Sequence, residues 1–323
     1  MGRPGNGTAD DNRKMSVEKK RVAIVVPVHN RRDITLQCLR SLSKINDQGL
    51  DVRIYIVDDG STDGTSEAIA NQFGSVNLIQ GDGNLWFTEG TNVGIRAALE
   101  HDPDFVLMMN DDQVFDPAFL RSLVETAISN PQTVVGSLLL LWDLPHRVFQ
   151  VAPVWKVAWG GWRHWHKQTV WTVPNRPWEV ELIVGNCLLV PADAFRQHGL
   201  MNSKRYPNFG DAEFTPRLRK AGWKLLIDPN SRVFCQPNNL PAVVRKMSLR
   251  KKINALFVDL KQIQNLRRRF YGYWDAAPSK LSAIAAFIVF FLRLAVGKNY
   301  EGRWGEKLPE PQLREFFAEN VVK

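Results

Sequence analysis

Cysteine and long apolar runs are both scarce in this chain. Its three cysteines, Cys38, Cys187 and Cys235, are odd in number and widely spaced, so they supply neither a disulfide framework nor a CxxC metal pair. This usage favours a reducing compartment. The apolar stretch 281–292 is shorter than the about 20 residues that span a bilayer. Residues 1–20 are polar, which predicts a disordered leader without a signal peptide.

Glycine-rich phosphate loops are missing as well. Neither GxGxxG nor GxxxxGK followed by Ser or Thr occurs in the sequence, so dinucleotide-binding and P-loop classes lack their signature. A nucleotide bound by this chain would therefore need a metal ion for its phosphates.

Short apolar runs alternate with helical patterns in the first half of the chain, which is typical of an α/β sheet with helices on both faces. The pattern predicts strands over 21–27, 52–57, 76–79, 105–109 and 134–141, and helices over 33–42, 65–71 and 91–99. Strands are also predicted over 181–190 and 224–227, with a helix between them that ends at Gly222. The pattern beyond residue 240 is helical only, which predicts a boundary there.

The net charge of +9 is confined to the C-terminal quarter. Residues 1–240 hold 26 basic and 26 acidic side chains, whereas residues 241–323 hold 16 and 7. A segment with this excess of positive charge is expected to bind a polyanion, either nucleic acid or an anionic membrane surface. Nucleic-acid binding is disfavoured, because the apolar residues 287–292 would have no role in it. Flanked by basic residues, the stretch 281–292 predicts an interfacial membrane helix, with a buried core helix as the alternative.

Polar residues follow three predicted strands at the point where each strand ends. The first cluster holds Pro27 and His29, the second holds Asp58 and Asp59, and the third covers residues 110–112. Ligands of open α/β sheets bind at the carboxyl ends of strands, so the clusters predict one shared site. Each cluster alone has the alternative of an ordinary turn or cap.

Asp111 and Asp112 follow a buried strand, and two adjacent carboxylates are costly there unless a cation joins them. A hard ion such as Mg²⁺ or Mn²⁺ prefers carboxylate and phosphate oxygens. The alternative is a turn in which one of them caps the next helix. Asp116, followed by Pro117, already suits that cap, so the pair predicts a divalent metal site.

Six motifs occur in order between residues 21 and 235. They are VPVHNR at 26–31, VDDGSTDGT at 57–65, GNLW at 83–86 with NVG at 92–94, MNDD at 109–112, GNCLLVP at 185–191, and FGDAEF at 209–214 with RLRKAG at 217–222. Together they resemble the family 2 glycosyltransferases of the GT-A fold, most closely the bacterial rhamnosyltransferase-like branch. The resemblance implies a GT-A domain over 21–240, with a nucleotide-sugar and metal part over 21–141 and an acceptor part over 142–240.

The resemblance also implies roles for single residues. Asp58 corresponds to the carboxylate that accepts the N3–H of uracil or thymine. Residues 110–112 occupy the place of the family's DxD metal motif, in which Asp112 carries most of the ligation and Asp111 assists. The other residues implied in nucleotide-sugar binding are Pro27, His29, Asp59, Asn84, Asn92 and Asn110.

Asp211 corresponds to the catalytic base of the family's Glu-Asp motif, although Gly210 replaces the usual Glu. Inverting transfer needs a carboxylate that takes the acceptor hydroxyl's proton as that oxygen attacks the anomeric carbon. Because Pro216 disfavours helix before it, Asp211 is predicted just ahead of a helix that begins at 214–216. The alternative is an acid that only interacts with the helix dipole.

Seven of the eleven tryptophans lie between residues 142 and 178, which sets this stretch apart. Aromatic faces stack on sugar C–H groups, so the stretch can form an acceptor platform. Burial in a core is the equal alternative. The residues that would form the platform are Trp159, Trp162, His164 and Trp165.

The sequence thus predicts an inverting, metal-dependent, non-processive glycosyltransferase. It would move a sugar from a UDP- or dTDP-sugar to a hydroxyl of a glycan or lipid-linked acceptor in cell-surface polysaccharide synthesis. The predicted location is the cytoplasmic face of the plasma membrane, as a peripheral protein. Residues 241–323 would contact the membrane surface. Nucleic acid is not a predicted partner. One rival is a sugar-nucleotide nucleotidyltransferase, which would need a glycine-rich triphosphate loop. The other is a non-catalytic nucleotide-sugar or glycan-binding module.

Overall fold

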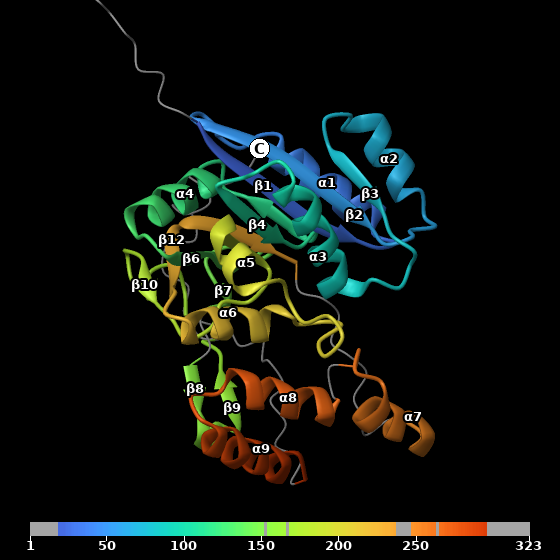
Figure 1. Cartoon of the computed structure of the whole chain (residues 1–323), viewed down its shortest axis with the longest axis vertical. Helices are drawn as coiled ribbons and strands as arrows, with labels where there is room; N and C mark the ends of the chain where they lie inside the picture. Colours follow the sequence, from blue (N-terminus) through green and yellow to red (C-terminus); the bar gives the residue numbers. More distant parts are fainter. Residues whose placement is uncertain (1–18, 152–153, 166–167, 237–246, 263–264, 296–323) are drawn as a thin grey trace, which may run out of the picture.

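A computed structural model describes residues 19–151, 154–165, 168–236, 247–262 and 265–295. Within these ranges ten strands form one mixed sheet (Figure 1). The predicted leader up to residue 18, the boundary predicted at residue 240 and the chain beyond residue 295 lie outside the described residues.

The parallel half of the sheet follows the predicted order. β1 (Lys20–Val28) pairs with β2 (Leu50–Asp58) on one side and with β4 (Phe105–Met109) on the other, and β3 (Asn77–Gln80) pairs with β2. The connecting helices are α1 (Arg32–Leu42), α2 (Thr65–Gln72) and α3 (Trp86–Leu99). The central strands are buried on both faces, as parallel strands between two helix layers are. All seven predicted elements of this half are confirmed.

Helix α3 begins at Trp86, five residues before the predicted start. Two glycines in its middle weaken the helical pattern, because glycine is a poor helix former. Packing requires one of them: a Cβ at Gly94 would lie 2.4 Å from Cγ1 of Val25. This glycine lets α3 lie directly on β1.

The second half of the sheet is mixed. β11 (Cys187–Pro191) runs antiparallel between β4 and β6 (Thr133–Leu141), and β12 (Lys224–Cys235) runs parallel to β6. Three short strands add to it: β5 (Gln113–Phe115), β7 (Val148–Gln150) and β10 (Trp178–Glu179). Its helices are α4 (Phe119–Ser129), α5 (Ala192–His198) and α6 (Asp211–Lys220).

Two predicted strands have wrong bounds in this half. The strand predicted over 181–190 begins only at Cys187, because residues 181–186 form a loop beside α6. The strand predicted over 224–227 continues to Cys235, since an irregularity in the pairing between Asp228 and Arg232 accommodates Pro229. α4 begins at Phe119, and Asp116 accepts the N–H of Ala118 in the turn before it.

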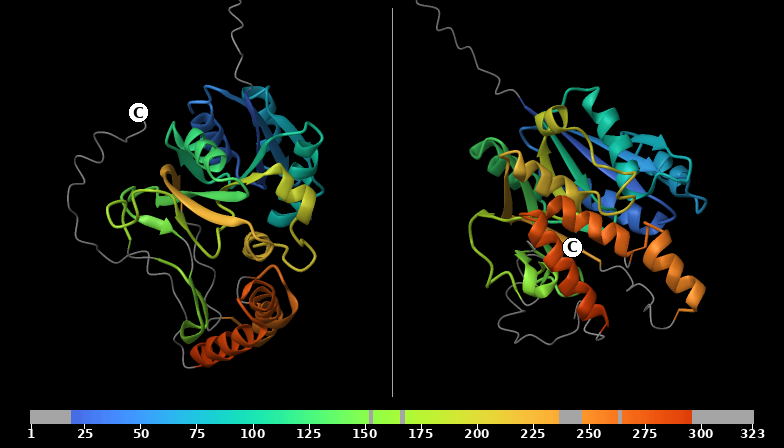
Figure 2. Two further views of the ribbon diagram at one scale, coloured as in Figure 1. Left: turned by 60° about the vertical axis from the view of Figure 1, so that its left-hand side comes forward. Right: turned by 60° about the horizontal axis from the view of Figure 1, so that its bottom comes forward.

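A separate lobe lies at one end of the molecule (Figures 1 and 2). It consists of α7 (Leu249–Ile253), η3 (Asn254–Val258), α8 (Leu266–Ala276) and α9 (Lys280–Ala295), and we call it the C-terminal lobe. A hairpin from the first domain reaches it: β8 (Val154–Lys156), η1 (Val157–Trp159) and β9 (Gly161–Arg163). No helix among the described residues is long and apolar enough to cross a membrane.

Candidate active site

A pocket of about 320 Å³ opens at the carboxyl ends of β1, β2 and β4. Pro27 and His29 line it at the end of β1, Asp59 at the end of β2, and Asn110 and Asp111 beyond β4. The three polar clusters predicted to share one edge of the sheet therefore meet. Parallel pairing explains this, because it brings the carboxyl ends of the three strands to the same edge.

Asp59 holds the loop that forms another wall of the pocket. Its carboxylate accepts the backbone N–H groups of Gly83 and Leu85 at 2.8 and 3.1 Å. It also accepts the N–H of Trp86 at 3.0 Å. Trp86 lines the pocket with a left-handed backbone, at a φ of 59°. Such a conformation costs on the order of 1–3 kcal/mol, and the bonds to Asp59 stabilise it.

Asp58 is fully buried and does not line the pocket, which differs from what its predicted role requires. One carboxylate oxygen accepts the N–H of Ser61 at 3.0 Å, and the other accepts the hydroxyl of Ser66. Asp58 thus fixes the turn after β2. The carboxylate on the pocket wall is that of Asp59.

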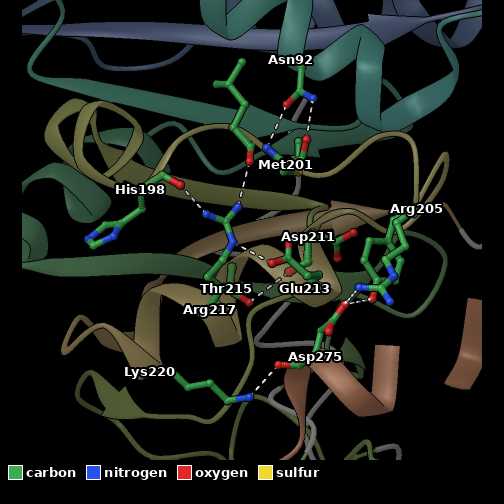
Figure 3. A network of polar contacts seen from close by, with 12 residues as sticks. Asn92, His198, Met201, Arg205, Asp211, Glu213, Thr215, Arg217, Lys220 and Asp275 are labelled. Carbon is green, nitrogen blue, oxygen red and sulfur yellow. Dashed lines mark hydrogen bonds and ion pairs between the residues drawn. The ribbon is translucent and has the colours of Figure 1, made fainter. Parts of the chain in front are cut away.

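Asn84 and Asn92, both predicted to bind the donor, also lie outside the pocket lining. The backbone N–H of Asn84 donates to Oδ1 of Asp82 at 2.9 Å within an exposed loop. Asn92 is buried and exchanges two hydrogen bonds with the backbone of Met201, at 2.9 and 3.2 Å (Figure 3). Because both ends of its amide are engaged, Asn92 joins α3 to the segment before α6.

An arginine pairs with both acids beyond β4. Nη1 of Arg31 lies 3.0 Å from Oδ1 of Asp111, and Nη2 lies 3.2 Å from Oδ2 of Asp112. Asp111 also accepts the hydroxyl of Thr35 at 2.9 Å. Burial raises the pKa of Asp111 to about 6, although Arg31 acts against this rise and Asp112 adds to it. Asp112 is buried and does not line the pocket.

The residues of this acidic site fit a divalent cation. Oδ1 of Asp112 and Oδ1 of Asn110 are buried and have no hydrogen-bond partner among the described residues. The described residues hold no group of three His, Cys, Asp or Glu side chains placed to bind a metal ion. Mg²⁺ commonly binds through one or two carboxylates plus substrate phosphates. Asp111, Asp112 and the amide oxygen of Asn110 supply such a set.

Asp211 is the first residue of α6, so the prediction that it precedes the helix is wrong. The helix continues through Pro216, whose cost is offset by the complete burial of Phe214 and Leu218. Asp211 is 6% exposed, and its Oδ2 accepts the N–H of Gly185 at 2.7 Å. Burial raises the pKa of Asp211, while the N–H of Gly185 lowers it. A raised pKa makes this carboxylate a stronger base.

Gly185 connects Asp211 to the pocket. A Cβ at Gly185 would lie 2.9 Å from Cβ of Asp211 and 3.3 Å from Cζ of Phe87, which lines the pocket. The lack of a side chain at Gly185 therefore lets Asp211 and Phe87 both pack close to its backbone, although Asp211 does not itself line the pocket.

Glycine at position 210, where the family has Glu, also fits its surroundings. A Cβ at Gly210 would lie 2.4 Å from Cγ2 of Thr88. The N–H of Gly210 donates to Oγ1 of Thr88 at 3.1 Å. Thr88 thus fills the space next to Asp211 and fixes the start of α6.

Glu213 is a second buried acid on α6. Nε of Arg217 donates to its Oε1 at 2.6 Å, and Arg217 also donates to the carbonyl of Leu200 at 2.8 Å (Figure 3). Burial raises the pKa of Glu213, against the effect of Arg217. Its Oε2 is buried without a hydrogen-bond partner among the described residues. Glu213 orients Arg217, which holds the segment before α6.

Comparison with known proteins agrees with this arrangement. Residues 23–140 match the model of the family described as Glycosyl transferase family 2. These residues belong to that family. The "N-acetylglucosaminyl-diphospho-decaprenol L-rhamnosyltransferase" of Mycobacterium tuberculosis is 28% identical over 205 residues, which cover 56% of this chain and 66% of that protein. This chain therefore spans just under two thirds of its relative's length.

Two further comparisons extend beyond the family 2 domain. An uncharacterized glycosyltransferase of Haemophilus influenzae is 21% identical over 288 residues, which cover 81% of this chain and 84% of that protein. The crystal structure of GalNAc-T7 with UDP, GalNAc and Mn²⁺ gives a TM-score of 0.58 at 15% identity, over 83% of this chain and 54% of that one. The likeness shows the fold alone, and it confirms the predicted GT-A type of α/β sheet.

The tryptophan-rich stretch contacts the C-terminal lobe. Trp155 lies edge-on to Trp162 and Tyr273, with ring centroids 5.1 and 5.2 Å apart. Its Nε1 donates to the hydroxyl of Ser282 at 2.5 Å. This hairpin therefore anchors α8 and α9.

The residues predicted to bind the acceptor do not line the described pocket. Trp159 is 42% exposed, with Arg163 and Arg293 over its ring. Trp165 packs against the core of the sheet, and His164 bonds to a side chain of β7. Acceptor binding by Trp159, Trp162, His164 and Trp165 stays a prediction.

Sequence reasoning missed four residues at the site. Arg31 follows the first strand-end cluster, and its charge next to that cluster was an available signal. Trp86 belongs to the GNLW motif, but the motif alone assigns it no role. Lys261 and Arg268 come from the C-terminal lobe, and no local pattern places them near the pocket. Nζ of Lys261 lies 3.9 Å from the ring centroid of Trp86.

Proposed function

We propose that this chain is an inverting, metal-dependent glycosyltransferase that moves a sugar from a UDP- or dTDP-sugar to a hydroxyl of a glycan or lipid-linked acceptor. One observation carries the proposal. Gly185 has two close neighbours: the buried carboxyl group of Asp211, and Phe87 on the wall of the pocket at the carboxyl ends of three parallel strands. A nucleotide-sugar pocket beside a positioned carboxylate is the arrangement that inverting transfer requires.

The nucleoside would lie against the ends of β1 and β2. Pro27 and His29 would contact the base and ribose. We transfer the base contact first predicted for Asp58 to Asp59, because Asp59 lies on the pocket wall. Its carboxylate accepts three N–H groups and can accept one more, since an ionised carboxylate has about four acceptor sites.

Asp211 would act as the general base. The acceptor hydroxyl would give its proton to the carboxylate oxygen of Asp211 that is not bonded to Gly185. The hydroxyl oxygen forms its bond to the anomeric carbon as the bond from that carbon to the diphosphate oxygen breaks. A bound Mg²⁺ or Mn²⁺, held by Asp112 and Asp111, would neutralise the charge of the departing diphosphate.

The acceptor class follows from a named relative. The mycobacterial protein is named as an L-rhamnosyltransferase for a lipid-linked N-acetylglucosaminyl diphosphate. We extend the lipid-linked class to this chain and place it in cell-surface polysaccharide synthesis.

Nucleotide-sugar binding gives the first test. In a thermal-shift panel of nucleotide sugars with and without Mn²⁺, the true donor should raise Tm, because a ligand at 100 times its Kd adds about 2.7 kcal/mol of stability. The stabilising donor should then release its nucleoside diphosphate when incubated with acceptor lipids. A panel of UDP- and dTDP-sugars that neither stabilises the protein nor is turned over would contradict the proposal.

We further propose that the C-terminal lobe lies on the cytoplasmic face of the plasma membrane. α9 buries Ala283 and Ala286 against α8 and the hairpin and leaves its opposite face exposed. Nine of the fourteen exposed large apolar side chains of the described residues belong to this lobe. They are Leu249, Ile253, Phe257, Val258, Leu281, Ile284, Ile288, Phe291 and Leu292.

Positively charged side chains near this apolar surface favour an anionic bilayer as its binding partner. Arg250 and Lys251 are exposed on α7 beside the apolar side chains, and Lys280 begins α9. An apolar helix face with adjacent cations suits the boundary between anionic headgroups and acyl chains. The cysteines are buried and unpaired, which fits the reducing cytoplasm.

Aspartate at two exposed positions of α9 should weaken membrane binding. Ile288 and Phe291 are 53% and 51% exposed, and burying each fully is worth about 1.5–3 kcal/mol. Ile288→Asp with Phe291→Asp should therefore reduce sedimentation with vesicles that contain phosphatidylglycerol at least tenfold. High salt should release the wild type only partly, because it screens charge and not apolar insertion.

The matched control is Ile128→Asp, at a residue of α4 that is 51% exposed. It should bind vesicles like the wild type. Equal sedimentation of the double variant and the control would contradict the proposal. If a dimer dissociates in the double variant instead, or if residues 296–323 become sensitive to protease without any change in vesicle binding, a second copy or the chain's own end covers this face.

A further inference from the structure

Two cations of the C-terminal lobe stand next to the proposed active site. Nζ of Lys261 lies 3.9 Å from the ring centroid of Trp86, which lines the pocket. Cζ of Arg268 lies 4.4 Å from the ring centroid of Phe209, two residues before Asp211. We call Lys261 and Arg268 the cationic rim.

The two aromatic residues under the cationic rim share their conformation and exposure. Trp86 and Phe209 both have a left-handed backbone, with φ of 59° and 66°, and each is 40% exposed. Their segments are bonded together: the N–H of Thr88 donates to the carbonyl of Pro207 at 3.0 Å. Strained backbone that persists is typical of functional sites. The bond between Thr88 and Pro207 therefore links the segment of Trp86 to that of Phe209.

Hydrogen bonds hold α8 against the segment that carries Asp211. Asp275 accepts Nη1 of Arg205 at 2.9 Å and the hydroxyl of Tyr206 at 2.6 Å (Figure 3). Its carbonyl accepts Nζ of Lys220 at 2.6 Å. These three bonds fix the helix on which Arg268 lies.

Lys261 is held on the same side. Its carbonyl accepts Nδ2 of Asn208 at 3.2 Å, in the segment just before Phe209. Its ammonium forms no ion pair with the described residues, whereas Arg31 on the pocket wall is already paired with two acids. Burial lowers the pKa of Arg268 to about 10, so this side chain is still a cation at neutral pH.

We propose that the cationic rim binds a substrate diphosphate. Lys261 supplies a compact charge with three donors. Arg268 is 8% exposed and adds positive charge beside Phe209. The inference rests on the proposed function, in which two substrates carry a diphosphate. The donor releases its diphosphate as part of the leaving group, and a lipid-linked acceptor has a diphosphate between sugar and lipid.

Calorimetry in the presence of a chelator tests the cationic rim without a metal contribution. The probes are UDP, uridine and inorganic pyrophosphate, and the variants are Lys261→Ala and Arg268→Gln. Lys44→Ala, at an exposed residue after α1, is the control. Loss of a charge-assisted hydrogen bond should weaken pyrophosphate binding about tenfold or more in both variants and leave uridine unchanged. Lys261→Arg should restore it.

The source of the diphosphate follows from two further measurements. A matching loss of UDP affinity assigns the cationic rim to the donor. Unchanged UDP affinity with a raised KM for a diphosphate-linked lipid assigns it to the acceptor. Pyrophosphate affinity, UDP affinity and acceptor KM that all equal those of Lys44→Ala would overturn the inference. A wild type that binds pyrophosphate through these residues but turns over no nucleotide sugar would contradict the proposed function alone.

Discussion

Asp211→Asn should reduce turnover at least 100-fold and leave nucleotide affinity nearly unchanged. The substitution keeps size and the acceptor for the N–H of Gly185, but removes the charge that takes the proton. General bases contribute about 10²- to 10⁴-fold. Turnover and UDP affinity, measured on the same preparation, check this result. Near-normal turnover would contradict the role of Asp211 and make Glu213 the next candidate.

The same substitution should not destabilise the fold. The raised pKa of Asp211 means that the folded state favours its protonated form, so its contribution to stability is lost as pH rises through the folded pKa. Asn has no charge to bury at neutral pH, so the Tm of the Asp211→Asn variant should equal or exceed that of the wild type. In the wild type, turnover should fall on the acidic side of its pH profile at a pH above the usual pKa range of Asp, because the base works only when it is ionised. A variant that unfolds would instead favour a purely structural acid at the start of α6.

Asp59→Ala is the matched comparison and should show the opposite pattern. Its removal frees the backbone N–H groups of Gly83, Leu85 and Trp86 from their common acceptor. The pocket wall then loses the side chain that holds it, so UDP affinity should decrease more than turnover at saturating donor does.

The strand-end clusters show what the sequence could predict. Strand order, parallel pairing and the place of ligand sites all follow from local patterns and general rules for α/β sheets. The sequence therefore predicts that Pro27, His29, Asp59, Asn110 and Asp111 share one site, and all five line the same pocket.

The sequence does not predict in which direction the side chains of those clusters point. Asp58 and Asp59 are adjacent and chemically identical, and only the turn after β2 decides that Asp58 bonds to Ser61 and Ser66 while Asp59 faces the pocket. Arg31 illustrates a second limit. Its pairing with Asp111 and Asp112 depends on how α1 lies beside the chain after β4, some 80 residues later.

The C-terminal lobe shows a third limit. Its basic charge was visible, and the whole excess was assigned to a membrane. The structure places Lys261 over Trp86 on the pocket wall and Arg268 over Phe209, two residues before Asp211. That placement depends on long-range bonds such as those of Asp275, which no periodicity reveals. The helical character of the described part of 241–323 is confirmed.

Asp112→Ala should reduce sugar transfer at least about 100-fold and remove the gain in UDP affinity that Mn²⁺ provides. A metal that neutralises the leaving diphosphate contributes several kcal/mol to the transition state, and each 1.36 kcal/mol is a factor of ten. The described residues offer no third carboxylate, thiolate or imidazole for such an ion, so loss of one acid should be decisive.

The Asp112 variant should still fold. Alanine removes Oδ1, which lacks a partner, together with Oδ2, which pairs with Arg31, but Arg31 keeps its ion pair with Asp111. Asp116→Ala is the matched control, since Asp116 only stabilises the turn before α4. UDP affinity is measured for both variants with Mn²⁺ and with chelator. The wild type should lose affinity in chelator, Asp116→Ala should lose the same amount, and Asp112→Ala should lose none. A chelator-treated wild type with full activity would contradict the metal site.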